Sequence, residues 1–336
     1  MLRTAKPTVC FILCSVFCVL FCGCQEGQKA VSSDSDENLL LSIDFKPNSQ
    51  LAYKIVSERQ VLLDLDPSGA NSRDGKGSGS VQNITERLEM GFVYKPIEID
   101  PYGYSVIEAQ CIDAKVGRSS GLSRAQNKKD AAEFLVNKTF TLKITPTGKV
   151  VDYSSLEALI KELGEKAFGS SAKTRVKDSD MIMDFIATQW NIWDSVASIK
   201  NPVKGIKKGQ KWNSKLLAPM PFVAKIGRDV EYQLKDFNSS TAEIVSSYKL
   251  SSSPPDTPMP YTGSFQMRGT FGFLQGYQVL SIEGSGSQIF DVEKGLIKTD
   301  TQQYQAKVKA SIFGLGRDSI EPNIIINQTI TMTLVE

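Results

Sequence analysis

The sequence predicts an α+β fold: a predominantly antiparallel β-sheet, strongly curved or barrel-like, with a two-helix insertion. Apolar and polar residues alternate over several long segments, which is typical of strands with one buried and one solvent-exposed face, and therefore of antiparallel sheets. Near the middle of the chain the period changes once to that of an α-helix. We expect about ten to twelve strands, some on each side of this insertion.

The alternation is clearest in four segments. Apolar side chains occupy most of the alternate positions in 139–145, 265–273, 303–312 and 324–334. Two connections between alternating runs, Thr145-Pro146-Thr147-Gly148 and Glu293-Lys294-Gly295, place glycine where a short hairpin needs a positive φ angle. These segments therefore predict hairpins of adjacent strands.

The insertion predicts two helices. Ser154 and Glu157 have the spacing of a capping box, and the apolar residues after them recur at intervals of three and four positions, which predicts a helix near 154–168. Asp178 can cap a second helix near 178–199, which must end before Asn201-Pro202.

The second helix has more apolar surface than a single contact with a sheet requires. Phe185 and Trp193 fall on its apolar side, whereas Trp190 and Ile192 fall outside it. Two interpretations remain open. Either the helix is deeply buried against the sheet, or Phe185, Trp190 and Trp193 form the lip of a binding site for an apolar ligand.

Residues 1–23 have the layout of an export signal. Arg3 and Lys6 precede thirteen residues, Val9 to Phe21, that carry no charge, and the segment closes on Phe21-Cys22-Gly23-Cys24. A basic start, a short apolar stretch and a small residue at the cleavage point are typical of a secretory signal, and the apolar stretch is too short to span a membrane.

The ending Gly23-Cys24 resembles the lipobox of bacterial lipoprotein precursors, although Phe21 and Cys22 depart from its commonest form. The resemblance implies cleavage before Cys24, acylation of Cys24 with palmitate-type chains, and a membrane-anchored, periplasm-facing lipoprotein. Gln25 after the cysteine favours the outer membrane. Residues 24–41 would be the lipidated N-terminus and a flexible tether, because 25–38 are polar and poor in apolar residues. An ordinary secretory signal or an uncleaved anchor is the alternative.

Charge and cysteine content narrow the partners of the mature chain. Removal of residues 1–23 leaves 37 basic and 37 acidic residues, so a basic stripe is missing and we expect no nucleic-acid partner. One short basic cluster, Lys204 to Lys208 with Lys211, is either a solvated turn or a site for a lipid headgroup or phosphate. Only Cys111 lies outside the signal and the lipidation site, so we expect a buried thiol and no internal disulfide.

Catalytic and metal-binding motifs are weak. The chain has no histidine, which excludes Ser-His-Asp and Cys-His catalysis and histidine-ligated zinc or haem. Gly117 to Gly121 and Ser170 to Lys173 match nucleophile motifs by spacing alone. A pair of carboxylates brought together by folding stays open, but we expect no enzyme, no catalytic residues and no cofactor. Asp64 and Asp66 have the spacing of a calcium loop that lacks its last acid, so we predict no metal site and leave calcium undecided.

Residues 42–336 predict a β-rich domain, which could consist of two halves that meet near 200–210 or 251–260. Three short motifs, together with the lipobox, resemble a family of uncharacterised exported β-rich lipoproteins of planctomycete-type bacteria. They are Thr-Pro-Thr-Gly-Lys-Val before a helix, Lys-Gly-Gln-Lys-Trp at 208–212, and the hairpin at 290–295. The resemblance implies architecture and location, and no activity.

We expect a non-enzymatic, membrane-anchored envelope lipoprotein. Its partners would be the membrane, through the acyl chains, and a lipid or another apolar ligand. The alternative is a structural or assembly module that docks an envelope protein. The surroundings of Trp190 and Ile192 distinguish the two: a position in a cavity favours a ligand, and a position on an exposed surface favours a protein partner.

The change Cys24→Ala tests the lipidation. It removes the only sulfur that the resemblance assigns to acylation, so we expect a chain that carries no acyl mass and is either soluble or unprocessed. Intact-mass spectrometry and membrane fractionation measure both. An unchanged mass and an unchanged membrane fraction would refute lipidation at this residue.

Overall fold

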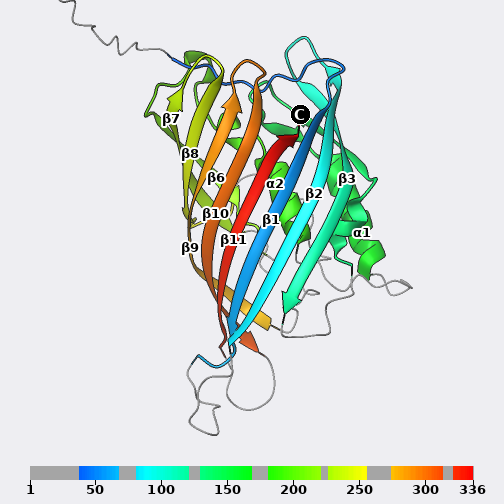
Figure 1. Ribbon diagram of the computed structural model, residues 1–336, viewed down its shortest axis with the longest axis vertical. Coiled ribbons are helices and arrows are strands. Elements are labelled where there is room, and N and C mark those ends of the chain that lie inside the picture. Colours follow the sequence, from blue (N-terminus) through cyan, green and yellow to red (C-terminus); the bar gives the residue numbers. More distant parts are fainter. Residues whose placement is uncertain are drawn as a thin grey trace, which may run out of the picture. The chain divides into compact units, whose positions relative to one another are not determined.

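Eleven antiparallel strands form one continuous sheet (Figure 1). The computed structural model describes residues 38–67, 81–120, 129–168, 181–220, 226–255, 274–312 and 321–335, and the statements below concern these residues. The strand order is β5-β4-β3-β2-β1-β11-β10-β9-β8-β7-β6. The last strand pairs with the first in the middle of the sheet. The prediction of a predominantly antiparallel sheet is therefore confirmed.

The strands vary greatly in length, and the central ones are the longest. Their bounds are β1(Leu51–Asp64), β2(Val81–Ile99), β3(Ser105–Ser120), β4(Thr139–Ile144), β5(Val150–Asp152), β6(Lys211–Leu217), β7(Gly227–Phe237), β8(Thr241–Leu250), β9(Leu274–Asp291), β10(Leu296–Ile312) and β11(Asn323–Val335). Gly148 and Gly295 have φ angles of 84° and 65°, which confirms both predicted glycine turns. The predicted strand at 265–273 lies outside the described residues.

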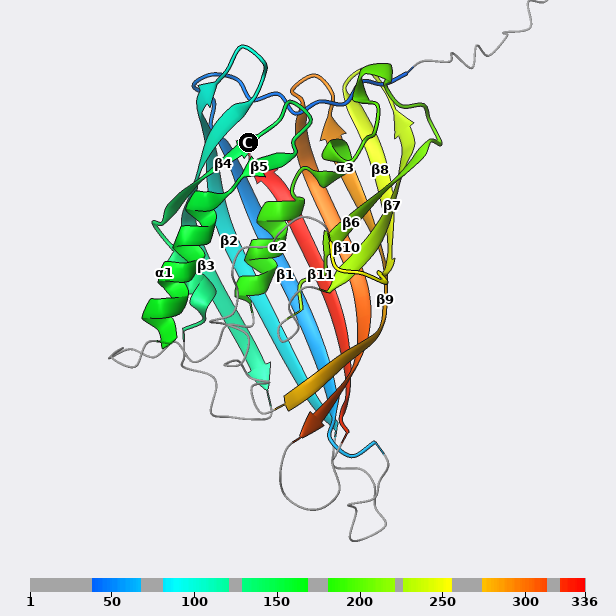
Figure 2. The same ribbon diagram turned by 180° about the vertical axis from the view of Figure 1, so that it is seen from behind.

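The edges of the sheet are β5 and β6, the two strands that flank the helices in the sequence. The sheet curves around these helices (Figure 2), but it is open, so the barrel-like form is not confirmed. Neither 200–210 nor 251–260 separates two sheets, because β1 pairs with β11 across the first range and β8 pairs with β9 across the second.

The insertion contains α1(Ser154–Phe168), α2(Ile182–Asn191) and α3(Asp194–Ala197). The first predicted helix is confirmed. The second, at 178–199, is wrong as one helix, because the backbone leaves helical geometry at Trp193, with φ −116° and ψ 9°. Two 3-10 helices, η1(Ala131–Leu135) and η2(Pro202–Lys204), complete the fold. Among the described helices, none is long and apolar enough to cross a bilayer.

Helices α1 and α2 lie on one face of the sheet, here called the inner face (Figure 2), and Figure 1 shows the opposite, outer face with no helix over it. The ring of Phe185 in α2 stacks on Phe92 of β2 at 5.4 Å and meets Phe140 of β4 edge-on at 6.0 Å. Trp193 meets Tyr94 edge-on at 6.0 Å. Since burial of one large apolar side chain contributes roughly 1.5–3 kcal/mol, these contacts hold α2 against the sheet.

Residues 38–45, here called the N-terminal strap, cross one end of the sheet (Figure 1). The strap buries Leu39, Leu41, Ile43 and Phe45. Leu39 exchanges two backbone hydrogen bonds of 2.8 Å with Ile206, and the Asp44 N–H donates to the carbonyl of Gly295. The strap therefore closes this end of the apolar core and ties the segment before β6 to the β9–β10 turn.

Gly284 in β9 tests the close packing between β9 and β10. A Cβ atom there would lie 2.3 Å from the carbonyl oxygen of Gln303 and 2.6 Å from the Cβ of Tyr304. We expect Gly284→Ala to destabilise the fold by about 1–3 kcal/mol. Gly117→Ala is the control, because nothing lies within 4 Å of its added methyl. Urea unfolding measures both, and equal stability of the two variants would contradict this packing.

Candidate functional site

A row of polar side chains crosses the inner face of the sheet. Arg118, Glu86, Arg59, Gln328 and Tyr304 are direct cross-strand neighbours on β3, β2, β1, β11 and β10. Residues of β1 on either side along this face, such as Ile55 and Val61, are apolar and buried. The row is therefore a polar band within an apolar interior, here called the polar row.

Arg59 is the centre of this row and is completely buried. Its Nε and Nη2 donate to Glu86 at 2.9 and 2.7 Å, and its Nη1 lies 3.5 Å from Asp184 of α2. Arg118 donates from Nε to the other Glu86 oxygen at 2.8 Å and also pairs with Asp130, which caps η1. The ion pairs thus connect the sheet to both α2 and η1.

Hydrogen bonds extend the network toward β10. The Ser57 hydroxyl donates to Asp184 at 2.7 Å, and the Gln328 amide donates to Ser57 at 3.0 Å. The Tyr304 hydroxyl donates to the Gln328 carbonyl oxygen at 2.5 Å. The network therefore runs continuously from η1 to β10 beneath α2.

The acids of this network differ in their pKa values. Burial alone would raise the pKa of Glu86, but the guanidiniums of Arg59 and Arg118 together outweigh burial and hold it below its usual value. Burial raises the pKa of Asp130 to about 6 and also raises the pKa of Asp184, although an arginine partly offsets each effect. Glu86 is therefore the ionised counter-charge shared by both arginines.

A second polar cluster lies on the inner face near β7, β8 and β10. The Arg228 guanidinium is buried between the rings of Tyr248 and Tyr304, at 4.7 and 5.7 Å, and its Nη2 donates to Gln302 at 2.7 Å. Its Nε and Nη1 have no hydrogen-bond partner within the described parts of the chain. The Gln302 amide donates in turn to Asp300. Burial raises the pKa of Asp300 to about 6.

Asp194, the first residue of α3, connects this second cluster to a cavity. It accepts hydrogen bonds from the Tyr232 hydroxyl at 2.9 Å and the Ser214 hydroxyl at 3.0 Å. Burial raises its pKa to about 6, while these two hydrogen bonds and Arg228 act in the opposite direction. Asp194 therefore joins α3 to β6 and β7 through a carboxylate that is costly to ionise.

A cavity of about 240 Å³, here called the edge pocket, separates the two sheet edges. Residues next to or in β5, residues of α2 and α3, and residues of β6 form its walls. They are Gly148, Lys149, Val150, Trp190, Asp194, Ala197, Ser198, Ser214, Lys215, Leu216, Leu217 and Pro255. Apolar side chains and two lysines line it together, which suits an amphipathic molecule.

The three predicted ligand-binding aromatics have different surroundings. Phe185 and Trp193 are buried among aromatic residues of the sheet and the strap, and Ile192 is buried as well. Trp190 lines the edge pocket, meets Tyr153 edge-on at 4.3 Å, and has an indole N–H without a hydrogen-bond partner among the described residues. By position, Trp190 alone of the three faces a cavity.

The other predicted positions are Cys24, Cys111, Asp64 and Asp66. Cys24 lies outside the described residues. Cys111 is buried, and burial, followed by the charge of Asp113, raises its thiol pKa to about 12. Asp64 accepts a hydrogen bond from the Asp66 N–H, and within the described ranges no group of three or more acids or cysteines could hold a metal.

A hollow of about 880 Å³ lies across the outer face at the middle of six strands. Its outward side chains are polar, and three carboxamide hydrogen bonds connect Asn83, Gln60, Asn327 and Gln305 across four strands. A polar outer face is expected of a sheet covered on one side only. Ionisable residues are exposed there, so we assign the chemistry of the protein to the inner face.

Sequence reasoning missed Arg59, Glu86, Arg118 and Asp184. A signal was present, because Arg59 occupies an inward position of the alternating β1 pattern, and Glu86 does so in β2. Charged residues at positions that the pattern assigns to the core predict buried ion pairs.

Glu86→Gln tests the polar row. The change removes the charge that compensates two buried guanidiniums, so we expect a loss of about 3–5 kcal/mol in the free energy of unfolding. Glu58→Gln is the control, because Glu58 pairs with Arg87 on the exposed outer face and should cost less than about 1 kcal/mol. Chemical denaturation distinguishes them. Equal losses in the two variants would show that the buried network has no special role.

Comparisons with known proteins place the chain by sequence more clearly than by structure. No curated protein sequence matches it. A structure described as "Lipid-protein interactions in lipovitellin" is 8% identical with a TM-score of 0.42, and the alignment covers 87% of this chain and 26% of that chain. An outer membrane channel from Pseudomonas putida F1 is 8% identical with a TM-score of 0.17, covering 87% and 100%.

An acetoacetate decarboxylase-like enzyme from Sphingomonas wittichii RW1 is 10% identical with a TM-score of 0.12, covering 85% of this chain and 92% of that chain. TM-scores this low support no conclusion about the present chain. The sequence match is different in kind, because residues 116–297, more than half of the chain, match one family. The chain belongs to the family described as "Family of unknown function (DUF6263)".

Proposed function

We propose that this protein is a non-enzymatic envelope lipoprotein, anchored through acylated Cys24, that binds a small amphipathic molecule or one end of a lipid in the edge pocket. The observation that carries the proposal is the position of Trp190, which lines this cavity and whose buried indole N–H has no hydrogen-bond partner among the described residues. An aromatic wall beside a few convergent polar groups is typical of small-molecule sites.

The lining suggests how such a ligand lies. Trp190, Leu216 and Leu217 offer apolar surface. Lys149 and Lys215 also line the pocket, and they favour an anionic head. A volume of about 240 Å³ is small for a whole lipid, so the pocket fits a head with the first part of a chain.

A binding role fits this pocket better than catalysis. Asp194 is the one acid among the described residues that line it, and its oxygens already accept hydrogen bonds from Tyr232 and Ser214. A glycosidase-type mechanism needs a second carboxyl group across the substrate. Of the other acids whose pKa is raised by burial, Asp130 and Asp184 are held by ion pairs with Arg118 and Arg59, and Asp300 accepts a hydrogen bond from Gln302.

The alternative is a module that docks an envelope protein. The position of β6 at the edge of the described sheet favours it, because an extended segment of a partner can add a strand to an exposed sheet edge. The other edge strand, β5, has three residues and offers little for pairing. The proposed anchor at Cys24 is the same for ligand binding and for protein docking.

Native mass spectrometry of the protein extracted from its own membrane tests the proposal. We expect a bound small molecule in the wild-type chain and its loss in Trp190→Ala, since an aromatic anchor in a pocket is typically worth 2 kcal/mol or more, about 30-fold in affinity. Phe134→Ala, which truncates an exposed aromatic residue of η1, is the matched control.

Two outcomes contradict the proposal. A ligand that Trp190→Ala retains would place the site elsewhere, and a stoichiometric protein in place of a small molecule would favour the docking module. Thermal unfolding of both variants checks that the loss of ligand does not follow from loss of the fold.

A further inference from the structure

We infer that the strap end of the molecule is a docking surface for an anionic lipid bilayer. The inference rests on the proposed acyl anchor at Cys24 and adds to it a second, electrostatic contact. A cavity of about 450 Å³ opens at this end beside the first described residue, Asn38. The side chains of Lys200, Lys204, Lys207 and Lys211 line it.

The positive charge of this lysine pocket is only partly compensated. Lys211 pairs with Glu231 at 2.7 Å, and the neighbouring Lys208 pairs with Asp236 at 2.9 Å. Lys200 and Lys204 are exposed and form no ion pair within the described ranges of the chain. Each lysine near an anionic membrane surface contributes about 1 kcal/mol, which is about fivefold in partitioning.

The lipid anchor joins the folded domain at the same place. The Asn38 amide donates to the Lys204 carbonyl at 2.9 Å, and Leu39 is bonded to Ile206, so the end of the tether is fixed beside the lysines. Fourteen residues lead from Cys24 to Asn38, and a chain of that length reaches at most about 50 Å. The lysine pocket therefore stays within this distance of a bilayer that holds the acyl chains.

Exposed apolar residues at this end favour an anionic bilayer over a free anion as the ligand of the lysine pocket. Val203 is 91% exposed beside the lysines, and Leu40 of the strap is 61% exposed. The β2–β3 hairpin reaches the same end of the sheet (Figures 1 and 2) and presents Tyr102, which is 83% exposed. Basic residues interspersed with apolar and tyrosine side chains are typical of surfaces that sit in the headgroup region.

The competing occupant of the pocket is the tether itself. It carries Glu26, Asp34, Asp36 and Glu37 against a single lysine, Lys29. Their charge is complementary to that of the lysines, but carboxylates offer nothing to Val203, Leu40 or Tyr102. We therefore assign the surface to the bilayer and treat the tether as an outcome of the test.

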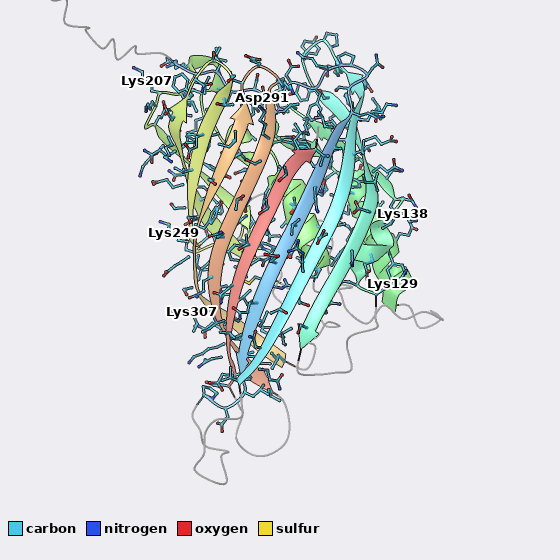
Figure 3. The ribbon with its side chains drawn as sticks, viewed as in Figure 1. Lys129, Lys138, Lys207, Lys249, Asp291 and Lys307 are labelled. Atoms are coloured by element: carbon cyan, nitrogen blue, oxygen red, sulfur yellow. The ribbon has the colours of Figure 1, made fainter. Side chains whose placement is uncertain are left out.

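Amine labelling of the acylated protein in vesicles tests the docking. The labelling rates of Lys200, Lys204 and Lys207 are compared between vesicles of phosphatidylcholine and vesicles that also contain phosphatidylglycerol. We expect these rates to fall several-fold only with phosphatidylglycerol. They should recover in about 1 M salt, because the Debye length is then about 3 Å and the attraction between lysines and lipid headgroups is screened. Lys307 is the internal control, because it lies toward the other end of the sheet from Lys207 (Figure 3).

Three results overturn the inference. Equal rates in both kinds of vesicle exclude docking, and protection by inorganic phosphate alone identifies a site for free anions. Protection that is already present in phosphatidylcholine, and is lost in Asp34→Asn/Asp36→Asn/Glu37→Gln, identifies the tether as the occupant.

Intact mass separates the two proposals: a chain without acyl groups on Cys24 overturns the anchor and the docking together, whereas an acylated chain with unprotected lysines overturns the docking alone.

Hydrogen exchange provides a second readout that does not depend on labelling. The hairpin at 97–104 should exchange more slowly in phosphatidylglycerol vesicles, and Lys200→Gln/Lys204→Gln/Lys207→Gln should abolish this protection. The matched control is Lys249→Gln/Lys307→Gln/Lys309→Gln, which removes the same charge from exposed positions on other strands. Protection that survives the first variant, or is lost in both, contradicts a role for the lysine pocket.

Discussion

The buried guanidinium of Arg59 is the constraint on which the arrangement of sheet and helices depends. A charge removed from water costs several kcal/mol unless its partners are in place, and those partners come from β2 and α2. Of the two acidic partners of Arg59, Glu86 lies on the sheet and Asp184 lies on α2. The charge of Arg59 is therefore compensated by both only when α2 lies across β1 with Asp184 directed at it. A buried network of this kind adds little net stability, but it discriminates against other positions of the helix.

The position of α2 in turn fixes the pocket. Phe185 and Trp193 pack against Phe92 and Tyr94, which leaves Trp190 on the side of the helix that faces the gap between the sheet edges. Because β5 and β6 are not paired with each other in the described sheet, the gap between them is bounded by residues of α2 and α3. An open sheet with its helices on the inner face thus produces a cavity that full closure would have filled.

Much of this architecture follows from the sequence, and the remainder depends on contacts that local patterns do not contain. Alternation in 139–145 and 303–312 and the glycines at 148 and 295 predicted strands and turns correctly, because burial on one face and a positive φ angle are local requirements. The break at Trp193 was missed, since it arises from packing against Phe45 and Tyr94. The polar row was also missed, because alignment of Arg118, Glu86 and Arg59 depends on the register of three strands.

The two proposed sites are adjacent, which bears on the choice between a lipid and a protein partner. Ser198 and Ser214 line the edge pocket, and their sequence neighbours Ile199 and Asn213 line the lysine pocket. A bilayer in contact with the lysines would therefore lie near the side of the edge pocket that Ser198 and Ser214 form. In that orientation a lipid could reach the edge pocket without crossing water, whereas a protein partner at β6 would compete with the membrane for the same end of the strand. If the proposed anchor holds the protein at the membrane, the adjacency of the two pockets supports an amphipathic ligand taken from the membrane over a docked protein.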